Sequence, residues 1–150
     1  MAGAVRNLIQ PSHIIPSLAA GTRRDALAEM VRLVTGFDQG PLLTALQERE
    51  AIGSSAIDPG LAVPHARVAG SGELEVCFAR SAAGIPWGAP DRQSVHLIFL
   101  MVASRGGGDN YLETLANLCR FLRDSSNRTL LMKASAEELV SFLTTARELQ

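Results

Sequence analysis

Hydrophobic residues recur at helical spacing in the first third of the chain. A first run follows Thr22 and Asp25, which have the spacing of a capping box, and it stops at Gly36. A second run opens at Gly40–Pro41 and ends near Gly53. The apolar residues are Leu27, Met30, Val31 and Val34 in the first run, and Leu42, Leu43 and Leu46 in the second. The pattern predicts two amphipathic helices.

The period changes in the middle of the chain. Residues 73–80, ELEVCFAR, alternate between apolar and other positions, which predicts a half-buried strand with Leu74, Val76 and Phe78 on its inner face. Residues 94–103, SVHLIFLMVA, are apolar at nearly every position, which predicts a central strand covered on both faces. Between them, Pro86, Gly88 and Pro90–Asp91 predict turns.

Helical spacing returns in the last third. Residues 111–122 predict a third helix, and Ser135 with Glu138 has the spacing that caps a fourth, while residues 125–133 give a weaker signal for a short helix. Helices first, strands in the middle and helices last predict an α/β (α+β) fold in which a mixed β-sheet is sandwiched between helices. The length fits a single domain, residues 1–150.

Composition and charge remove several classes of function. Fourteen basic and fifteen acidic residues give a net charge of −1 without a run of like charge, so we expect no nucleic-acid partner. The N-terminus lacks the apolar stretch of a secretory signal, and no segment approaches the length of a membrane span. We therefore expect a cytoplasmic protein without direct membrane insertion. The motifs GxGxxG and GxSxG and a P-loop are also missing.

The cysteines and two of the three histidines predict structure rather than chemistry. Cys77 and Cys119 lack the spacing of a zinc site, so we expect two buried free thiols. His13 stands between two prolines and reads as a structural or exposed residue. His96 lies inside the apolar strand, where a hydrogen-bonded core histidine is the usual case. A metal site built from His65, His96 and a cysteine is the alternative.

His65 has different surroundings. It follows a short apolar run, residues 61–63, and Pro64, so we predict a brief strand that ends at the proline and exposes the imidazole where the chain leaves the sheet. Pro64 also fixes its own backbone φ, which limits the movement of the neighbouring ring. The polar residues close in sequence that can hold an anion near this ring are Arg49, Ser54, Ser55 and Arg67.

Three longer segments carry a resemblance to a known family: EREAIGSSAIDPGLAVPHARV (48–68), GIPWGAPDRQSVHLIFLMVAS (84–104) and YLETLANLCRFLRD (111–124). In order and spacing they resemble the enzyme IIA domains of the fructose/mannitol class of the bacterial phosphoenolpyruvate-dependent phosphotransferase system, a class that includes the nitrogen-regulatory enzyme IIA proteins. The resemblance runs from about Leu8 to the last helix and implies a cytoplasmic phosphocarrier with a mixed sheet between helices.

The resemblance also implies roles for particular residues. His65 matches the family histidine that accepts a phosphoryl group from the phosphorylated histidine-containing phosphocarrier protein. It then passes the group to a IIB domain or, in nitrogen-type members, its phosphorylation state regulates a target protein. Arg49 matches the family arginine, whose guanidinium neutralises phosphate oxygens. Ser54, Ser55 and Arg67 are candidate phosphate-binding residues. No metal or organic cofactor is expected.

One departure from the family pattern concerns Tyr111. Many members have a second histidine at the start of the third helix, where this chain reads Tyr-Leu-Glu-Thr-Leu-Ala (111–116). A phenol donates a hydrogen bond but carries no positive charge, so we expect altered phosphotransfer, with Arg105 as a possible source of the missing charge. The alternative function is a regulatory binding module with weak or no phosphotransfer. His96 replaces a frequent family aspartate, which we read as a structural substitution.

Overall fold

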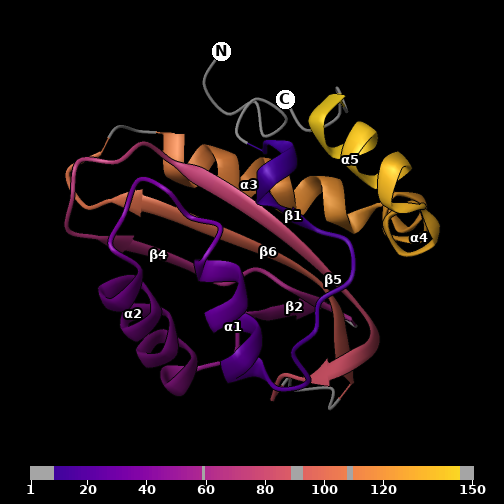
Figure 1. Ribbon diagram of the computed structural model, residues 1–150, viewed down its shortest axis with the longest axis horizontal. Helices are drawn as coiled ribbons and strands as arrows, with labels where there is room; N and C mark the ends of the chain where they lie inside the picture. The colour runs from indigo at the N-terminus through magenta and orange to yellow at the C-terminus, as the bar shows by residue number, and fades with distance from the viewer. Residues whose placement is uncertain (1–8, 59, 89–92, 108–109, 146–150) are drawn as a thin grey trace.

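A computed structural model describes residues 9–58, 60–88, 93–107 and 110–145 (Figure 1). The helices are α1 (Arg23–Val31), α2 (Gln39–Ile52), α3 (Asn110–Arg123), α4 (Ser125–Lys133) and α5 (Ala136–Thr145), with a 3-10 turn η2 (Pro11–His13). The strands are β1 (Ile14–Ile15), β2 (Ala56–Asp58), β3 (Leu61–Ala62), β4 (His65–Val68), β5 (Glu75–Pro86) and β6 (Ser94–Ser104). The weakly signalled helix at residues 125–133 is therefore present as α4.

The described strands form one mixed sheet in the order β1-β5-β6-β3-β2. Strands β5 and β6 are antiparallel and form its long centre. Strands β3 and β4 lie one after the other along the same edge of β6, both parallel to it, with Leu61 opposite Leu97 and His65 opposite Met101. This edge carries the first functional candidate, His65.

Two hydrophobic cores lie on opposite faces of the sheet, with α1 and α2 on one side and α3, α4 and α5 on the other (Figure 1). Alternate residues of β6 divide between them: Phe99 and Met101 face α3, whereas Ile98 and Leu100 face the α1–α2 layer. Each fully buried side chain of this kind contributes about 1.5–3 kcal/mol. The predicted sheet between helix layers is confirmed.

The helix starts that were predicted from local spacing are also confirmed. Thr22 Oγ1 accepts a hydrogen bond from Asp25 N at 3.1 Å at the start of α1. Ser135 and Glu138 form a reciprocal capping box before α5, with distances of 3.1 Å to Ser135 Oγ and 2.8 Å to Glu138 Oε1. None of the helices in the described ranges has both the length and the apolar character needed to span a bilayer.

Strand β5 differs from its prediction in length and in burial. The strand was expected to be half-buried, but Cys77 and Ala79 on its second face are fully buried because α1 and α2 cover them. It also continues to Pro86, through a register shift between Arg80 and Ile85. The predicted turn at Pro90–Asp91 lies outside the described residues. Cys77 is a buried free thiol as expected, whereas Cys119 is only half-buried.

The segment around His13 forms structure that the sequence did not predict. Strand β1 pairs with β5 through Ile14 opposite Phe78, and His13 is buried with its Nε2 3.2 Å from Glu75 Oε1. The Glu75 carboxylate also accepts hydrogen bonds from the backbone N–H groups of Thr35 and Gly36. His13 is therefore a structural residue that helps to hold the N-terminal segment on the sheet.

Candidate functional site

His65 opens strand β4 instead of following the end of the sheet. Strand β3 stops at Ala62, the next two residues interrupt the ladder, and pairing with β6 resumes at His65, opposite Met101. Pro64 has no N–H to give to a ladder, but its carbonyl accepts from Met101 N at 3.0 Å. The imidazole is half-buried. The expected exposed strand end is thus wrong in detail, because two short strands share one edge.

A backbone hydrogen bond sets the tautomer of His65. Its Nδ1 lies 2.7 Å from the carbonyl oxygen of Val63. A carbonyl oxygen only accepts hydrogen bonds, so Nδ1 carries the proton in the neutral ring and Nε2 keeps its lone pair. The ring therefore presents Nε2 as a nucleophile and holds Nδ1–H against the backbone.

The Val63 peptide is itself held by a chain of hydrogen bonds from the end of α2. Val63 N donates to the Ser55 carbonyl at 3.0 Å. Ser55 N in turn donates to Glu50 Oε1 at 3.1 Å, and Trp87 Nε1 donates to Ser55 Oγ at 3.2 Å. Ser55 is buried, so its place is inside this loop, between the α2 helix and the Val63 peptide.

Glu50 is a buried carboxylate that the sequence did not single out. Arg23 Nη1 lies 3.8 Å from Glu50 Oε1 and donates to the Trp87 carbonyl at 2.9 Å. Glu50 is 5% exposed, so its charge needs these partners to offset the cost of desolvation. Together Arg23, Glu50, Ser55 and Trp87 fix the loop that supports Val63. Only its position next to Arg49 could have drawn attention to Glu50.

Tyr111 lies beside both the His65 ring and the Arg67 guanidinium group. Its ring centroid is 6.2 Å from that of His65, with the two planes tilted by 55°. The Arg67 guanidinium carbon is 4.4 Å from the Tyr111 ring centroid, which is a cation–π contact. His65 and Arg67 are two residues apart on β4, so both side chains lie on the same face of the strand.

Burial makes the Tyr111 hydroxyl harder to ionise. It raises the pKa of Tyr111 to about 12, against the opposing charges of Arg67 and Arg49. Arg49, in the last turn of α2, also donates to the Gly53 carbonyl at 2.9 Å. The structure thus brings His65, Tyr111, Arg67 and Arg49 into one electrostatic neighbourhood, with two cations and one phenolic donor.

The remaining candidates lie at the margins of this group. Ser54 is half-buried, and its Oγ accepts from Ala56 N at 3.1 Å, which leaves its O–H free to donate. Arg105 lies with Glu48 and Val68 along a hollow between α2 and the end of β4. Val68 faces the α2 core, so Arg105 is placed toward the opposite side of the strand from Arg67.

His96 does not share a site with His65. On β6 it precedes Leu97, the partner of Leu61, and lies five residues before Met101, the partner of His65, which is roughly 16 Å along the strand. Its Nδ1 is 2.9 Å from the Ser81 carbonyl, in line with the expected hydrogen-bonded residue. Across the described ranges, no three His, Cys, Asp or Glu side chains gather in a way that would hold a metal ion.

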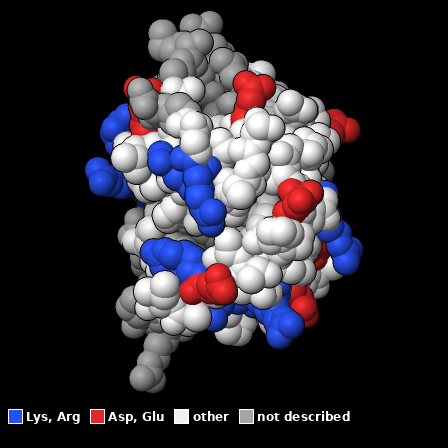
Figure 2. All heavy atoms as spheres, turned by 90° about the vertical axis from the view of Figure 1, so that its left-hand side faces the viewer, with Lys and Arg blue, Asp and Glu red and all other residues white. Residues whose placement is uncertain are grey.

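Charged side chains on the face that Figure 2 shows are interspersed with uncharged ones. This view looks onto the side of the molecule at the left of Figure 1, where β4 ends and α3 begins. Basic and acidic groups both occur there. A continuous basic stripe of the kind that follows a nucleic-acid backbone is not present on this face.

Comparison with known proteins gives the family. The family model described as "Phosphoenolpyruvate-dependent sugar phosphotransferase system, EIIA 2" matches residues 7–145. The chain belongs to this family. The match covers every described strand and helix, and the fold is that of an enzyme IIA domain.

Individual relatives carry names of two kinds, nitrogen regulatory protein and sugar-specific EIIA component. The chain is 32% identical over 123 residues to a nitrogen regulatory protein of Bradyrhizobium diazoefficiens, covering 80% of each chain. It is 33% identical over 103 residues to a PTS system fructose-specific EIIA component of Haloferax volcanii, covering 69% of this chain and 67% of the relative. The crystal structure of nitrogen regulatory protein IIA-Ntr from Neisseria meningitidis superimposes with a TM-score of 0.84 at 29% identity, covering 93% and 98%.

Proposed function

We propose that this protein is a phosphocarrier and that His65 is its phosphoryl acceptor. The observation that carries the proposal is the 2.7 Å contact between His65 Nδ1 and the Val63 carbonyl, which leaves Nε2 as the nucleophile. The ring attacks the phosphorus of a phosphohistidine on the histidine-containing phosphocarrier protein. An Nε2–P bond forms while the donor N–P bond breaks, and the bonding electrons return to the donor imidazole.

The surrounding residues fit the charge changes of this step. As Nε2 bonds to phosphorus, positive charge develops on the imidazole, and the Val63 carbonyl stabilises it through Nδ1–H. Arg49 and Arg67 neutralise the phosphoryl oxygens, and Tyr111 and Ser54 donate hydrogen bonds to them. Ser55 acts through the loop backbone. The transfer needs alignment and charge neutralisation, so no metal or organic cofactor enters the proposal.

The second transfer goes to a partner. In a transport role the phosphoryl group moves from His65 to a IIB-type domain, and in a regulatory role the phosphorylated and unphosphorylated forms bind a target protein differently. The two relatives described above carry names of both kinds. We expect either role to be carried out in the cytoplasm.

The decisive experiment is reconstitution of the first transfer. The protein is incubated with phosphoenolpyruvate, enzyme I and the histidine-containing phosphocarrier protein, and intact mass is measured. We expect a gain of one phosphoryl group that is labile in acid and stable in base, and its loss in His65→Ala. His96→Gln is the matched control and keeps the gain. No gain with cognate partners contradicts the phosphocarrier proposal, whereas a gain that survives in His65→Ala contradicts only the choice of residue.

A regulatory binding module with little phosphotransfer is the second candidate. Tyr111 favours it, because a phenol with a pKa of about 12 supplies no positive charge to the phosphoryl group. A binding partner that is captured equally well by the wild type and by His65→Ala, together with no phosphoryl gain in the reconstituted system, supports this candidate over the first.

A further inference from the structure

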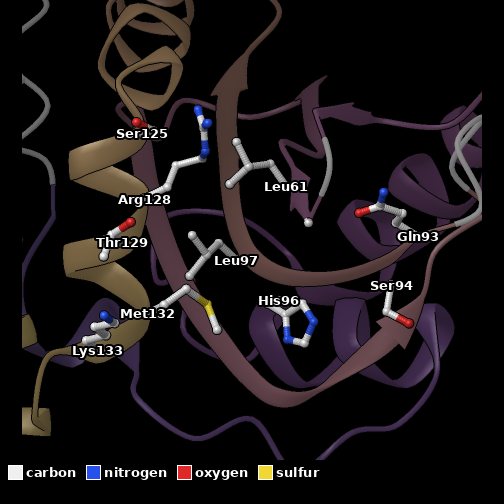
Figure 3. Close-up of a pocket in the computed structure, with 11 residues that line it drawn as sticks. Leu61, Gln93, Ser94, His96, Leu97, Ser125, Arg128, Thr129, Met132 and Lys133 are labelled. Carbon is white, nitrogen blue, oxygen red and sulfur yellow. The ribbon is translucent and has the colours of Figure 1, made fainter.

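A pocket lies at the other end of β6 from His65. It is a cavity of about 590 Å³ between α4 and the strand residues around Leu61 and Leu97. Figure 3 shows Arg128 and Met132 reaching from α4 toward the sheet, with His96 and Ser94 on the strand opposite. The volume is in the usual range for sites that enclose a small organic molecule. None of the residues proposed for phosphoryl transfer lines it.

The wall of this cavity is rich in hydrogen-bond donors and has no acidic member among the described residues. Arg128 and Lys133 donate only, and the hydroxyls of Ser94, Ser125 and Thr129 can donate as well. The described residues hold no hydrogen-bond or ion-pair partner for the exposed Lys133 ammonium group. A wall with two cationic side chains and no carboxylate among its described residues favours a negatively charged ligand.

Arg128 is held in place by its own helix and the helix before it. One of its N–H groups donates to the Leu122 carbonyl at the end of α3, and four N–H groups remain. Its charge helps to lower the pKa of Asp124, after the hydrogen bonds from Ser126 and Asn127. Asp124 caps the start of α4 through Ser126 N and does not line the cavity, so it offsets the guanidinium charge without blocking the site.

The floor of the cavity is apolar. Leu61 and Leu97 are almost fully buried beneath it, and Met132 stays 38% exposed at its edge. An exposed methionine beside two leucines offers adaptable apolar contact area to a ligand. The cations and the apolar floor come from facing elements, so one molecule can touch both.

His96 lines the same cavity and lies next to two glycines. Gly60 and Gly84 have φ values of 82° and 85°, and a Cβ on Gly84 would lie 2.9 Å from His96 Cε1. The absence of a side chain at Gly84 leaves room for the imidazole, whereas a Cβ on Gly60 would be in ordinary contact, 4.0 Å from His96 Cδ2. Its Nδ1 donates to the Ser81 carbonyl at 2.9 Å, so Nε2 of the neutral ring is an acceptor.

We propose that this cavity is a binding site for a small organic anion. The phosphate or carboxylate of the ligand contacts Lys133, and its apolar part covers Met132 above Leu61 and Leu97. Arg128, nearer the other end of α4, adds to the positive potential of the wall (Figure 3). His96 Nε2 accepts a hydrogen bond from a ligand donor where one is present. The site is separate in space from the proposed phosphoryl acceptor, because its lining and the His65 neighbourhood have no residue in common.

The test uses three probes with the same ring: phenyl phosphate, benzoate and benzyl alcohol. Each is titrated into the full chain, and the backbone amide signals are followed by NMR. We expect saturable shifts at Leu97, Thr129 and Lys133 with at least one anion, and much weaker binding of benzyl alcohol. The order of phenyl phosphate and benzoate distinguishes a phosphate ligand from a carboxylate ligand.

Two variants with equal charge changes provide the control. Lys133→Gln should weaken binding of the anion by roughly tenfold, because it removes one charge-assisted hydrogen bond. Arg24→Gln, on the exposed surface of α1, should leave it unchanged. Equal weakening in both variants overturns the proposal, as do equal binding of benzyl alcohol, the absence of saturable shifts, and shifts confined to Tyr111 and its neighbours.

Discussion

Tyr111 lies 6.2 Å from the His65 ring between centroids, and the family resemblance implies that it replaces a second histidine. Its hydroxyl is the one hydrogen-bond donor that this side chain can offer to a phosphoryl group. We expect Tyr111→Phe to slow phosphorylation of His65 or shorten the phosphohistidine lifetime by roughly tenfold to a hundredfold, the effect of one lost hydrogen bond to a charged group.

The converse substitution tests whether charge is limiting. Tyr111→His should speed phosphorylation if the missing second histidine limits transfer. Both rates are measured in the reconstituted system by quenched mass spectrometry. If Tyr111→Phe keeps the wild-type rate and lifetime, the hydroxyl does not contact the phosphate.

The same residue has a measurable titration, because Tyr111 is the single tyrosine of the chain. Its folded-state pKa is about 12, mainly through burial, against a usual value of 10.0. The raised pKa means that the unfolded chain loses this proton first, so the free energy of unfolding falls as the pH rises above 10 toward 12. Tyrosinate absorbance should appear near pH 12, and a midpoint near 10 in the folded protein would contradict the buried position.

Arg67 should shift this titration in a defined direction. The Arg67 charge lowers the Tyr111 pKa, so Arg67→Gln should move the tyrosinate midpoint further upward. Arg24→Gln removes an equal charge on α1 and should leave the midpoint where it is. A downward shift in Arg67→Gln would show that the cation–π contact is not made in solution.

At the scale of elements, we expect the α2–β2 loop, which contains Ser55, to determine how well His65 is positioned. Glu50→Ala leaves Ser55 N and Arg23 without their buried partner, which should lower the free energy of unfolding by about 1–3 kcal/mol. Glu50→Gln keeps the acceptor for Ser55 N and should recover part of that loss. Urea denaturation gives these values, with the exposed Glu48→Gln as control.

If Glu50 only stabilises the fold, its replacement leaves the His65 tautomer unchanged. The tautomer is therefore a second measurement, which tests whether Glu50 positions His65. In Glu50→Ala the Val63 peptide loses its support, and ¹⁵N NMR shifts of the His65 ring should report a mixture of tautomers in place of the Nδ1–H form. Phosphorylation should slow in parallel. If Glu50→Ala loses the full stability but keeps His65 entirely in the Nδ1–H form, then Glu50 contributes to folding and does not position His65.

The sequence predicts an element well when the interactions that form it join residues close together in the chain. The caps at Thr22 and Ser135 were predictable because donor and acceptor are three residues apart. The two-residue strand β1 exists only through its pairing with β5, and β5 is buried on its second face only because α1 and α2 cover it. No periodicity within either strand encodes those contacts.

The candidate site divides in the same way. Arg49, His65 and Tyr111 were chosen as candidates because the family motifs mark their positions. The contact of Arg67 with the Tyr111 ring and the link from Glu50 through Ser55 to Val63 depend on tertiary structure. The position of His65 at the start of β4 was missed because the Pro64 interruption reads in sequence as the end of a strand.

At the scale of the whole molecule, β6 carries two separate sites, with His65 beside its second half and the cavity at His96 beside its first. Gly84→Ala tests their independence. A methyl group there would lie 2.8 Å from Ser94 Cβ, on a backbone with φ of 85° that favours glycine. We expect a loss of about 1–2 kcal/mol in the free energy of unfolding.

Gly84→Ala should nevertheless keep the rate of His65 phosphorylation at a temperature where it is folded, because strain at Gly84 falls on Ser94 and His96, several ladder positions from Met101. Gly21→Ala is the control, since a Cβ there meets no atom within 4 Å. The anion probes should bind less tightly to Gly84→Ala, as the His96 ring is displaced. A joint loss of phosphorylation and anion binding in folded Gly84→Ala would mean that β6 transmits the strain along its length and that the two sites are coupled.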